Sequence, residues 1–146
     1  RVILTPHPGQ DSSARQKISD LWRATGARVV EMEAEQHDGI FAATSHLPHV
    51  LAYSFVGLLA RLDTQGEIFP NAGGGFRDFT RIASSSPDMW HDIVHANSVS
   101  VTRLLEQQIG ELNDILGLMK SGRWDEIKKL FERARAARER FLAQIE

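Results

Sequence analysis

The chain has 146 residues, of which 42% are hydrophobic and 25% charged, so it can bury a core and is not a disordered segment. Its formal net charge of −2 argues against a nucleic-acid-binding surface, which needs clustered Lys and Arg. The absence of cysteine excludes disulfides, thiolate metal sites and a cysteine nucleophile, and it fits a reducing compartment, so we expect a cytoplasmic protein. No run of residues is long and apolar enough to span a bilayer.

The first 32 residues have the pattern of a β-α-β unit. The expected elements are a strand at Val2–Leu4, a helix capped by Ser12 or Ser13 that runs to about Thr25, and a strand at Arg28–Met32. Gly26 is expected to end the helix. Because a strand of three apolar residues needs sheet neighbours, and the chain starts within it, we expect this sequence to be a fragment that begins in the tail of an α/β domain.

The rest of the chain is expected to be helical. The helices predicted from apolar spacing and capping residues are about Asp38–Leu62, Phe76–Ala83, Pro87–Lys120 and Trp124–Ile145. Pro48 should kink the first of them, Asp63–Gly75 should form a loop, and Ser86 should cap the third. The last two helices are longer than one small core needs, and their apolar stripes predict packing against a second subunit.

Two arginines one helical turn apart are the first candidate for chemistry. Arg77 and Arg81 are expected on one face of a short helix, and a guanidinium matches a carboxylate through two parallel hydrogen bonds. The competing interpretation is that Arg77 pairs with Asp78 or Glu67 at the surface, while Arg81 caps a neighbouring helix. The residues alone favour the surface interpretation.

The run Gly73–Gly75 does not match a dinucleotide-binding loop, because it does not follow a strand and position 78 is Asp where a third glycine is required. Glycines at this place allow a close approach of the backbone to a ligand. The alternative is a simple turn into the following helix.

Histidines on a helix are the second candidate. His46 and His49 share a face, and His37 precedes them by about two and a half turns. Metal binding is the competing idea, also for the pair His91 and His95, but no carboxylate stands at helical spacing within Ser45–His49. Each histidine also has an ordinary structural role open to it, and we expect no bound metal.

Four motifs taken together resemble one family, the prephenate/arogenate (cyclohexadienyl) dehydrogenases of tyrosine biosynthesis. They are His37-Asp38, Ser45–His49 (SHLPH), Gly73–Ala83 (GGGFRDFTRIA) and Ser84–Trp90 (SSSPDMW). The resemblance implies a mainly α fold, in which residues 33–146 form an all-helical substrate-binding and dimerisation domain. Residues 1–32 would be the C-terminal βαβ strip of a Rossmann nucleotide-binding domain.

The resemblance also implies roles for individual residues. Arg81 would grip the ring carboxylate of the substrate, Gly74 would touch the substrate, and His46 and His49 would line its pocket. Trp90, whose default role is a packing anchor, would reach toward the site of the partner subunit. The supporting residues that would not touch substrate are His37, Asp38 and Asp78, while Arg77 stays structural.

The activity implied is oxidative decarboxylation of prephenate or arogenate with NAD or NADP, in a homodimer, with tyrosine as a possible feedback inhibitor. The family's catalytic histidine and glycine-rich cofactor loop would lie upstream of Arg1, so we expect no catalytic residue in this stretch and no turnover by it alone. The sequence does not distinguish NAD from NADP or prephenate from arogenate. Two alternatives stay open: a non-catalytic regulatory domain that binds an aromatic amino acid, and a metal-dependent helical bundle.

Overall fold

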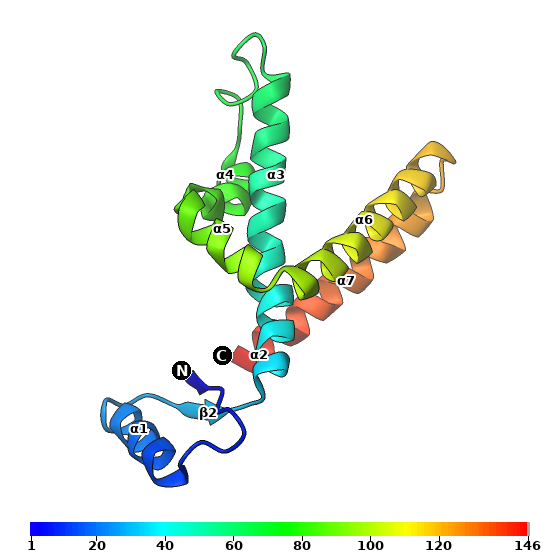
Figure 1. Cartoon of the computed structure of the whole chain (residues 1–146). Coiled ribbons are helices and arrows are strands. Elements are labelled where there is room, and N and C mark those ends of the chain that lie inside the picture. Colours follow the sequence, from blue (N-terminus) through cyan, green and yellow to red (C-terminus); the bar gives the residue numbers. More distant parts are fainter. Residues whose placement is uncertain (146) are drawn as a thin grey trace. The chain divides into compact units, whose positions relative to one another are not determined.

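The computed structural model describes residues 1–145, and they divide into two compact units, Arg1–Leu104 and a second unit that starts at Leu105. Helices dominate both, and the only sheet in the described part of the chain has two strands. Figure 1 shows the order of the elements along the chain. The expected mainly α fold with a short βαβ segment is confirmed.

The first unit opens with strands β1 (Val2–Leu4) and β2 (Val29–Glu31), which pair in parallel so that Ile3 lies opposite Val30. Helix α1 (Ser12–Ala24) connects them. Its N-cap is Asp11 rather than Ser12 or Ser13, because the Asp11 carboxylate accepts the backbone N–H of Ser13 at 2.9 Å. This hydrogen bond lowers the pKa of Asp11. Gly26 follows the helix at φ +85°, as predicted for its end.

The next segment is helical from Ala34 to Leu62 but is not one regular helix. It consists of α2 (Ala34–Phe41), a π-helical turn η1 (Ala42–His46) and α3 (Leu47–Leu62). The prediction placed its start at Asp38, which was four residues late, because the first turn is polar and carries no apolar periodicity. Pro48 is the second residue of α3, just after η1 ends at His46, and a proline cannot donate the regular backbone hydrogen bond to the preceding turn. The expected disturbance at Thr44–Pro48 therefore takes the form of a π-helical turn.

The glycine-rich segment starts a helix two residues earlier than predicted. Helix α4 (Gly74–Thr80) includes Gly74 and Gly75, which the prediction had assigned to a loop, and it tightens into a 3₁₀ turn η2 (Arg81–Ser84). Phe76 explains its position, since its ring lies 6.0 Å from Phe55 of α3 and 5.9 Å from Phe69, measured between ring centroids. This aromatic packing holds α4 and η2 against α3.

The prediction of one helix over Pro87–Lys120 was wrong. The structure has α5 (Pro87–Ala96) and α6 (Ser98–Lys120), separated at Asn97, whose φ of −111° and ψ of 31° leave the helical range. Asn97 is buried, and its side chain makes tertiary hydrogen bonds that a regular helix would not direct. The cap of α5 is as predicted: the Ser86 side chain accepts the backbone N–H of Met89, and Pro87 opens the helix.

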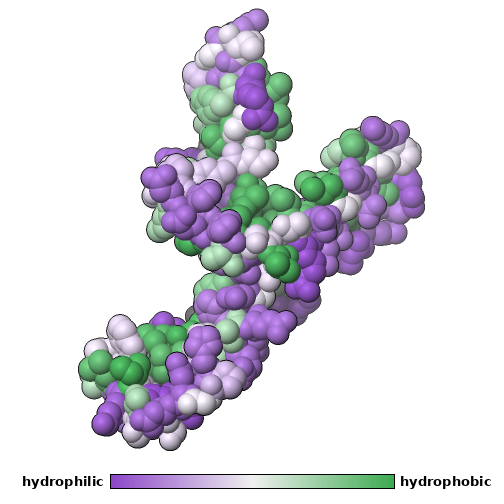
Figure 2. Space-filling model, viewed as in Figure 1, coloured by the Kyte–Doolittle hydropathy of each residue, from purple (hydrophilic) through white to green (hydrophobic). Residues whose placement is uncertain are grey.

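The second unit is a helical hairpin. It contains the end of α6 and all of α7 (Trp124–Ile145), which was predicted with these bounds. Gly122, at φ +68°, sits in the turn between them, and α7 returns antiparallel to α6 (Figure 1). Ile127 is buried, but several large apolar side chains of the hairpin are exposed: Ile109, Leu112, Leu116, Met119, Trp124, Phe131 and Phe141. Figure 2 shows hydrophobic residues at the surface of this hairpin.

The first unit also leaves apolar side chains uncovered. On α1, Ile18, Leu21 and Trp22 are 48%, 60% and 43% exposed. A two-stranded sheet cannot cover such a face, so β1, α1 and β2 have the character of an incomplete layer. Within residues 1–145, no helix combines the length and the apolar composition needed to cross a membrane.

Candidate functional site

The candidate site is built around a histidine stacked on a tryptophan. His49, in the first turn of α3, and Trp90, on α5, have ring centroids 3.4 Å apart and planes inclined by 17°. Trp90 is 9% exposed, and its indole N–H has no hydrogen-bond partner among the described residues. The stack fixes α5 against the start of α3 and offers a flat aromatic wall.

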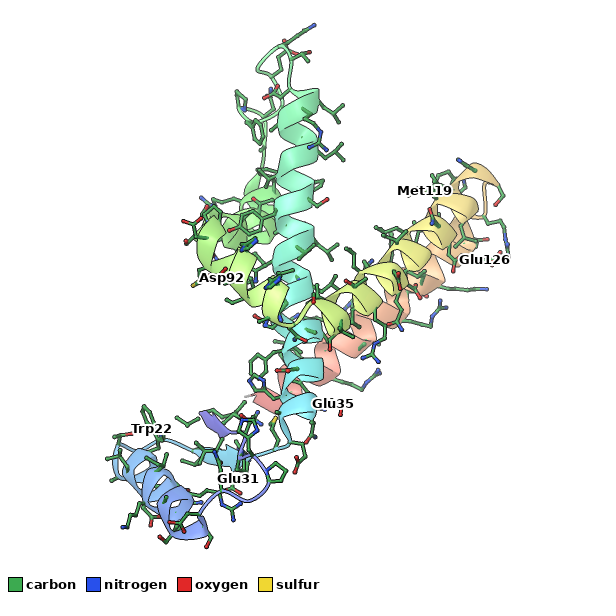
Figure 3. All side chains as sticks on the ribbon, in the orientation of Figure 1. Trp22, Glu31, Glu35, Asp92, Met119 and Glu126 are labelled. Atoms are coloured by element: carbon green, nitrogen blue, oxygen red, sulfur yellow. The ribbon has the colours of Figure 1, made fainter. Side chains whose placement is uncertain are left out.

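A hollow of about 340 Å³ adjoins this stack. It is lined by His49, Val50, Tyr53, Pro87, Trp90, His91 and Val94. These residues come only from α3 and α5, the helix that carries the labelled Asp92 in Figure 3. The walls are mostly apolar with a few polar atoms, which is the usual make-up of a small-molecule site.

The turn that carries Arg81, η2, is joined to α3 by a hydrogen bond. The Tyr53 hydroxyl donates to the carbonyl oxygen of Ser85, the residue after η2, at 2.6 Å. Tyr53 is one helical turn beyond His49 and lines the hollow. Arg81, the first residue of η2, is exposed. Within residues 1–145 its guanidinium makes no hydrogen bond or ion pair, so it is available for an anion.

Arg77 and Asp78 are both exposed on α4, and neither pairs with a charged side chain within residues 1–145. The alternative in which Arg77 pairs with Asp78 or Glu67 is therefore not what the structure shows. Gly74 is the first residue of α4, and a Cβ built on it would meet nothing within 4 Å. The backbone of Gly74 is thus open to approach from outside.

His46 lies at the end of η1 and contacts the side chain of Asn97, which also binds the backbone of α2. The Asn97 amide nitrogen is 3.2 Å from His46 Nδ1 and donates to the backbone carbonyl of Asp38 at 2.8 Å. The His46 ring also meets Trp90 edge-on, with centroids 6.1 Å apart. Burial lowers the pKa of His46, the Asp38 carboxylate opposes this, and His37 and His49 add to the lowering.

His49 has its own backbone partner. Its Nδ1 lies 2.9 Å from the carbonyl oxygen of Ser45, one turn earlier. Since a carbonyl only accepts, Nδ1 must carry the proton, and Nε2 of the neutral ring is left as an acceptor. Ser45 lies in the π-helical turn η1, four residues before His49, and at this helical spacing its carbonyl oxygen is within reach of the His49 ring.

The pair His37 and Asp38 lies on α2, with His37 Nδ1 3.0 Å from Asp38 Oδ1 and the His37 ring against Phe41. The structure therefore brings together His46, His49 and Trp90 by direct ring contact, with Asp38 joined through its carbonyl. No hydrogen bond or ion pair within residues 1–145 links that cluster to Gly74, Asp78 or Arg81. These three belong to α4 and η2, which pack on α3.

Three residues of this arrangement were missed from the sequence. Asn97 was passed over as a helix-interior residue, although Asn favours helix ends and its presence inside an apolar pattern was a usable signal. Tyr53, the only tyrosine in the chain, stands within an apolar helix. The sequence indicated only that its hydroxyl would need a hydrogen-bond partner, not which one. Ser45 takes part through its backbone, which no side-chain pattern reveals.

The metal-binding alternative depends on how the histidines and carboxylates are grouped. Among residues 1–145 there is no group of three or more His, Asp or Glu side chains that could hold a metal ion. The His91 and His95 rings lie parallel, with centroids 6.0 Å apart on the exposed side of α5, and His91 Nδ1 contacts Asp92 at 3.0 Å.

Comparison with known proteins adds the family context. The family profile described as "Prephenate dehydrogenase, dimerization domain" matches residues 33–133. Cyclohexadienyl dehydrogenase of Zymomonas mobilis is 35% identical over 139 residues, which cover 94% of this chain and 47% of that protein. Prephenate dehydrogenase of Bacillus subtilis is 35% identical over 138 residues, covering 94% of this chain and 37% of that protein.

Solved structures give the same picture. Prephenate dehydrogenase from A. aeolicus, in complex with hydroxyphenyl propionate and NAD+, superposes with a TM-score of 0.88 at 34% identity, covering 95% of this chain and 49% of that one. Synechocystis arogenate dehydrogenase, at 21% identity and a TM-score of 0.81, shares the fold. The chain thus spans between 37% and 51% of the length of these relatives.

Proposed function

Because the chain belongs to the prephenate dehydrogenase family, we propose that it is the substrate-binding and dimerisation part of a cytoplasmic prephenate or arogenate dehydrogenase of tyrosine biosynthesis. The reaction is an oxidative decarboxylation with NAD or NADP as hydride acceptor. The observation that carries the proposal is the hollow beside the His49–Trp90 stack, together with an uncommitted arginine on the turn anchored to the same helix.

Arg81 is proposed to hold the ring carboxylate of the substrate. Its guanidinium has no competing carboxylate within residues 1–145, and its turn is fixed by the bond from Tyr53 to Ser85. A two-pronged contact would orient the carboxylate for departure as carbon dioxide. Gly74, on the helix that leads into this turn, is proposed to contact the substrate through its backbone, with Asp78 as a supporting residue on the same helix.

The rings of His46, His49 and Trp90 are proposed to form the wall of the substrate site. Trp90 is buried against its own chain, which accounts for its role as a packing anchor. Its approach to the site of a partner subunit stays a prediction. His37 and Asp38 are proposed to support the site from α2, because the Asp38 carbonyl holds the Asn97 amide that contacts His46.

The cofactor is proposed to be held mainly outside residues 1–146. The three consecutive glycines of this chain open α4 and do not follow a strand, so they do not fit a dinucleotide phosphate. The segment 1–32 fits better as the edge of a nucleotide-binding domain, with 33–146 as a separate helical domain. A hollow of about 360 Å³ adjoins the carboxyl end of β1, where open α/β sheets bind ligands, with Thr5, Pro6 and Asp11 in its wall.

When bound, the nicotinamide would accept the hydride from the carbon that bears the ring hydroxyl. That hydroxyl loses its proton to a base, the ring carboxylate leaves as carbon dioxide, and the ring becomes aromatic. This chain is proposed to contribute substrate binding and orientation, with no catalytic acid or base of its own. Tyrosine shares a ring and a carboxylate with the reacting compound, and it is proposed to inhibit by feedback.

The experiment gives the full-length protein prephenate or arogenate, each with NAD or NADP. The absorbance of the reduced nicotinamide measures the turnover of each of the four combinations. We expect turnover with at least one pairing and none from residues 1–146 alone. Binding of tyrosine without turnover in any pairing would instead support a non-catalytic domain that binds an aromatic amino acid. Turnover by residues 1–146 alone would show that the chemistry resides in this chain.

A further inference from the structure

The orientation of the Asn97 amide can be read from its partners. Its nitrogen lies 2.8 Å from the backbone carbonyl oxygen of Asp38, which accepts and never donates. The NH₂ end of the amide must therefore face that carbonyl, because the opposite orientation would set two oxygens against each other. The same nitrogen lies 3.2 Å from His46 Nδ1. Asn97 thus directs one proton to Asp38 and offers the other to His46.

This arrangement determines which nitrogen of His46 carries a proton. A donor facing Nδ1 requires a lone pair there, so the neutral ring has its proton on Nε2. A proton on Nδ1 would face the Asn97 N–H and break the contact. Burial of the ring acts in the same direction, since it disfavours the doubly protonated form.

His49 is set in the opposite way. Its Nδ1 donates to the Ser45 carbonyl at 2.9 Å, so its Nε2 has the lone pair. Two histidines three residues apart, both in contact with Trp90, are therefore held as different tautomers by different partners. His46 keeps a ring N–H as its free group, and His49 keeps an acceptor.

We propose that Asn97 is a positioning residue that fixes His46 as the Nε2–H tautomer, so that His46 and His49 give the substrate site one hydrogen-bond donor and one acceptor. The substrate assignment rests on the proposed function, whereas the tautomers rest on the structure alone. Such a pair distinguishes a ligand that carries both a hydroxyl and a carboxylate or carbonyl from one that carries only acceptors.

The position of Asn97 agrees with this role. Asn97 is 9% exposed and interrupts the helical run between α5 and α6. An uninterrupted helix would have a lower free-energy cost at this position. A break of this kind places the amide between α2 and η1, which are 59 and 51 residues away along the chain. A residue that only ended a helix would not need both partners.

The test is nitrogen-15 NMR of the full-length protein labelled at histidine, with ring nitrogens assigned by His46→Gln and His49→Gln. At pH 7.5 we expect His46 to show a protonated Nε2 and His49 a protonated Nδ1. Asn97→Asp puts an acceptor beside Nδ1, so His46 should change to the Nδ1–H form, while His49 should not change. Asn113→Asp, an exposed asparagine on α6, is the matched control.

A protonated Nδ1 on His46 in the unchanged protein would overturn the proposal, and this outcome needs no variant to fold. An unchanged His46 tautomer in a folded Asn97→Asp variant would overturn it as well. Neither result depends on which compound the enzyme oxidises. A failure to oxidise prephenate or arogenate with the expected tautomers present would instead count against the proposed function.

Discussion

Residues far apart in sequence hold the helices of the first unit together, whereas the side-chain pairs of the hairpin are local. Around His46, the contacts of Asn97 reach α2 and η1, and Tyr53 reaches the end of η2. In the hairpin, the ion pairs Arg123–Glu126, Lys128–Glu132 and Arg135–Glu139 join residues three or four apart on exposed surface. Such pairs each stabilise a helix by only about 0.2–0.5 kcal/mol.

The difference indicates what each region depends on. The junction at which His46 and His49 meet Trp90 buries Trp90 and the neighbouring Asn97 within the chain, so it can keep its geometry by itself. The hairpin buries Ile127 but leaves Leu112, Leu116 and Phe131 about half exposed. We expect a partner to cover an apolar stripe this open. The family profile that matches residues 33–133 is described as a dimerization domain, so a second copy of the chain is the partner we propose.

The largest effect should follow from removing the anchor of the junction. Trp90→Ala should lower the free energy of unfolding by about 3–5 kcal/mol, because a buried aromatic side chain leaves a cavity and the His49 stack is lost. Urea denaturation measures this. Trp124→Ala, at a tryptophan that is 62% exposed in the hairpin, is the comparison. An equal loss at both positions, independent of protein concentration, would remove the distinction between the two regions.

The next effect concerns Arg81, on the turn η2 that packs against α3. In the full-length enzyme, Arg81→Ala should weaken substrate binding by about 2–5 kcal/mol with little change in cofactor binding, since a two-pronged charge contact is lost. Lys at this position should restore it only in part. Arg77→Ala, on α4, is the control and should cost much less. Equal losses at both arginines, or a loss confined to the Michaelis constant of the cofactor, would mean that the carboxylate contact is assigned wrongly.

Sequence reasoning succeeded where a local signal decides the structure. Strand Val2–Leu4, the capped start of α5 at Ser86-Pro87 and helix Trp124–Ile145 follow from apolar spacing and capping alone. It failed where a distant partner decides. The break at Asn97 exists because the side chain finds the Asp38 carbonyl 59 residues away, and apolar spacing runs through it unchanged.

The site shows the same limit. Arg81, His46, His49 and Trp90 were proposed from motif resemblance. The structure adds what the motif lacks, namely the ring contacts and the partner of Nδ1 in each of the two histidines. Tyr53 and Ser45 act through a long-range bond and a backbone carbonyl. Neither contact follows from residue type and spacing. The Tyr53 hydrogen bond depends on where η2 packs, and the Ser45 contact depends on the backbone of the π-helical turn.

A smaller effect is expected in the hairpin. Ile109, Leu112, Leu116 and Met119 repeat at three- and four-residue spacing along α6, with Met119 at the turn end (Figure 3). Leu116→Glu should raise the dimer dissociation constant by roughly ten- to a hundredfold, because apolar burial is worth about 1.5–3 kcal/mol per side chain. Sedimentation equilibrium measures it, and Gln107→Glu on the same helix controls for the added charge. A wild-type protein that is monomeric at micromolar concentration would contradict the dimer itself.

The smallest expected effect is a pH dependence that belongs to the junction and not to the hairpin. Burial lowers the pKa of His46 in the folded protein, so the neutral ring is favoured there. Below the ordinary histidine pKa, the unfolded chain takes up a proton that folded His46 resists, and stability therefore falls as the pH drops from about 6.5 toward the lowered pKa. Above that window His46 contributes no change.

Denaturation midpoints measured between pH 7.5 and 5 should decline less in His46→Gln than in the unchanged protein, because glutamine does not titrate and its carbonyl can still accept from Asn97. His91→Gln is the control, since His91 is an exposed histidine on α5. The same acid decline in all three proteins would show that His46 is not the group responsible. A decline reduced by both substitutions would point to the surface of α5 instead of its contact with η1.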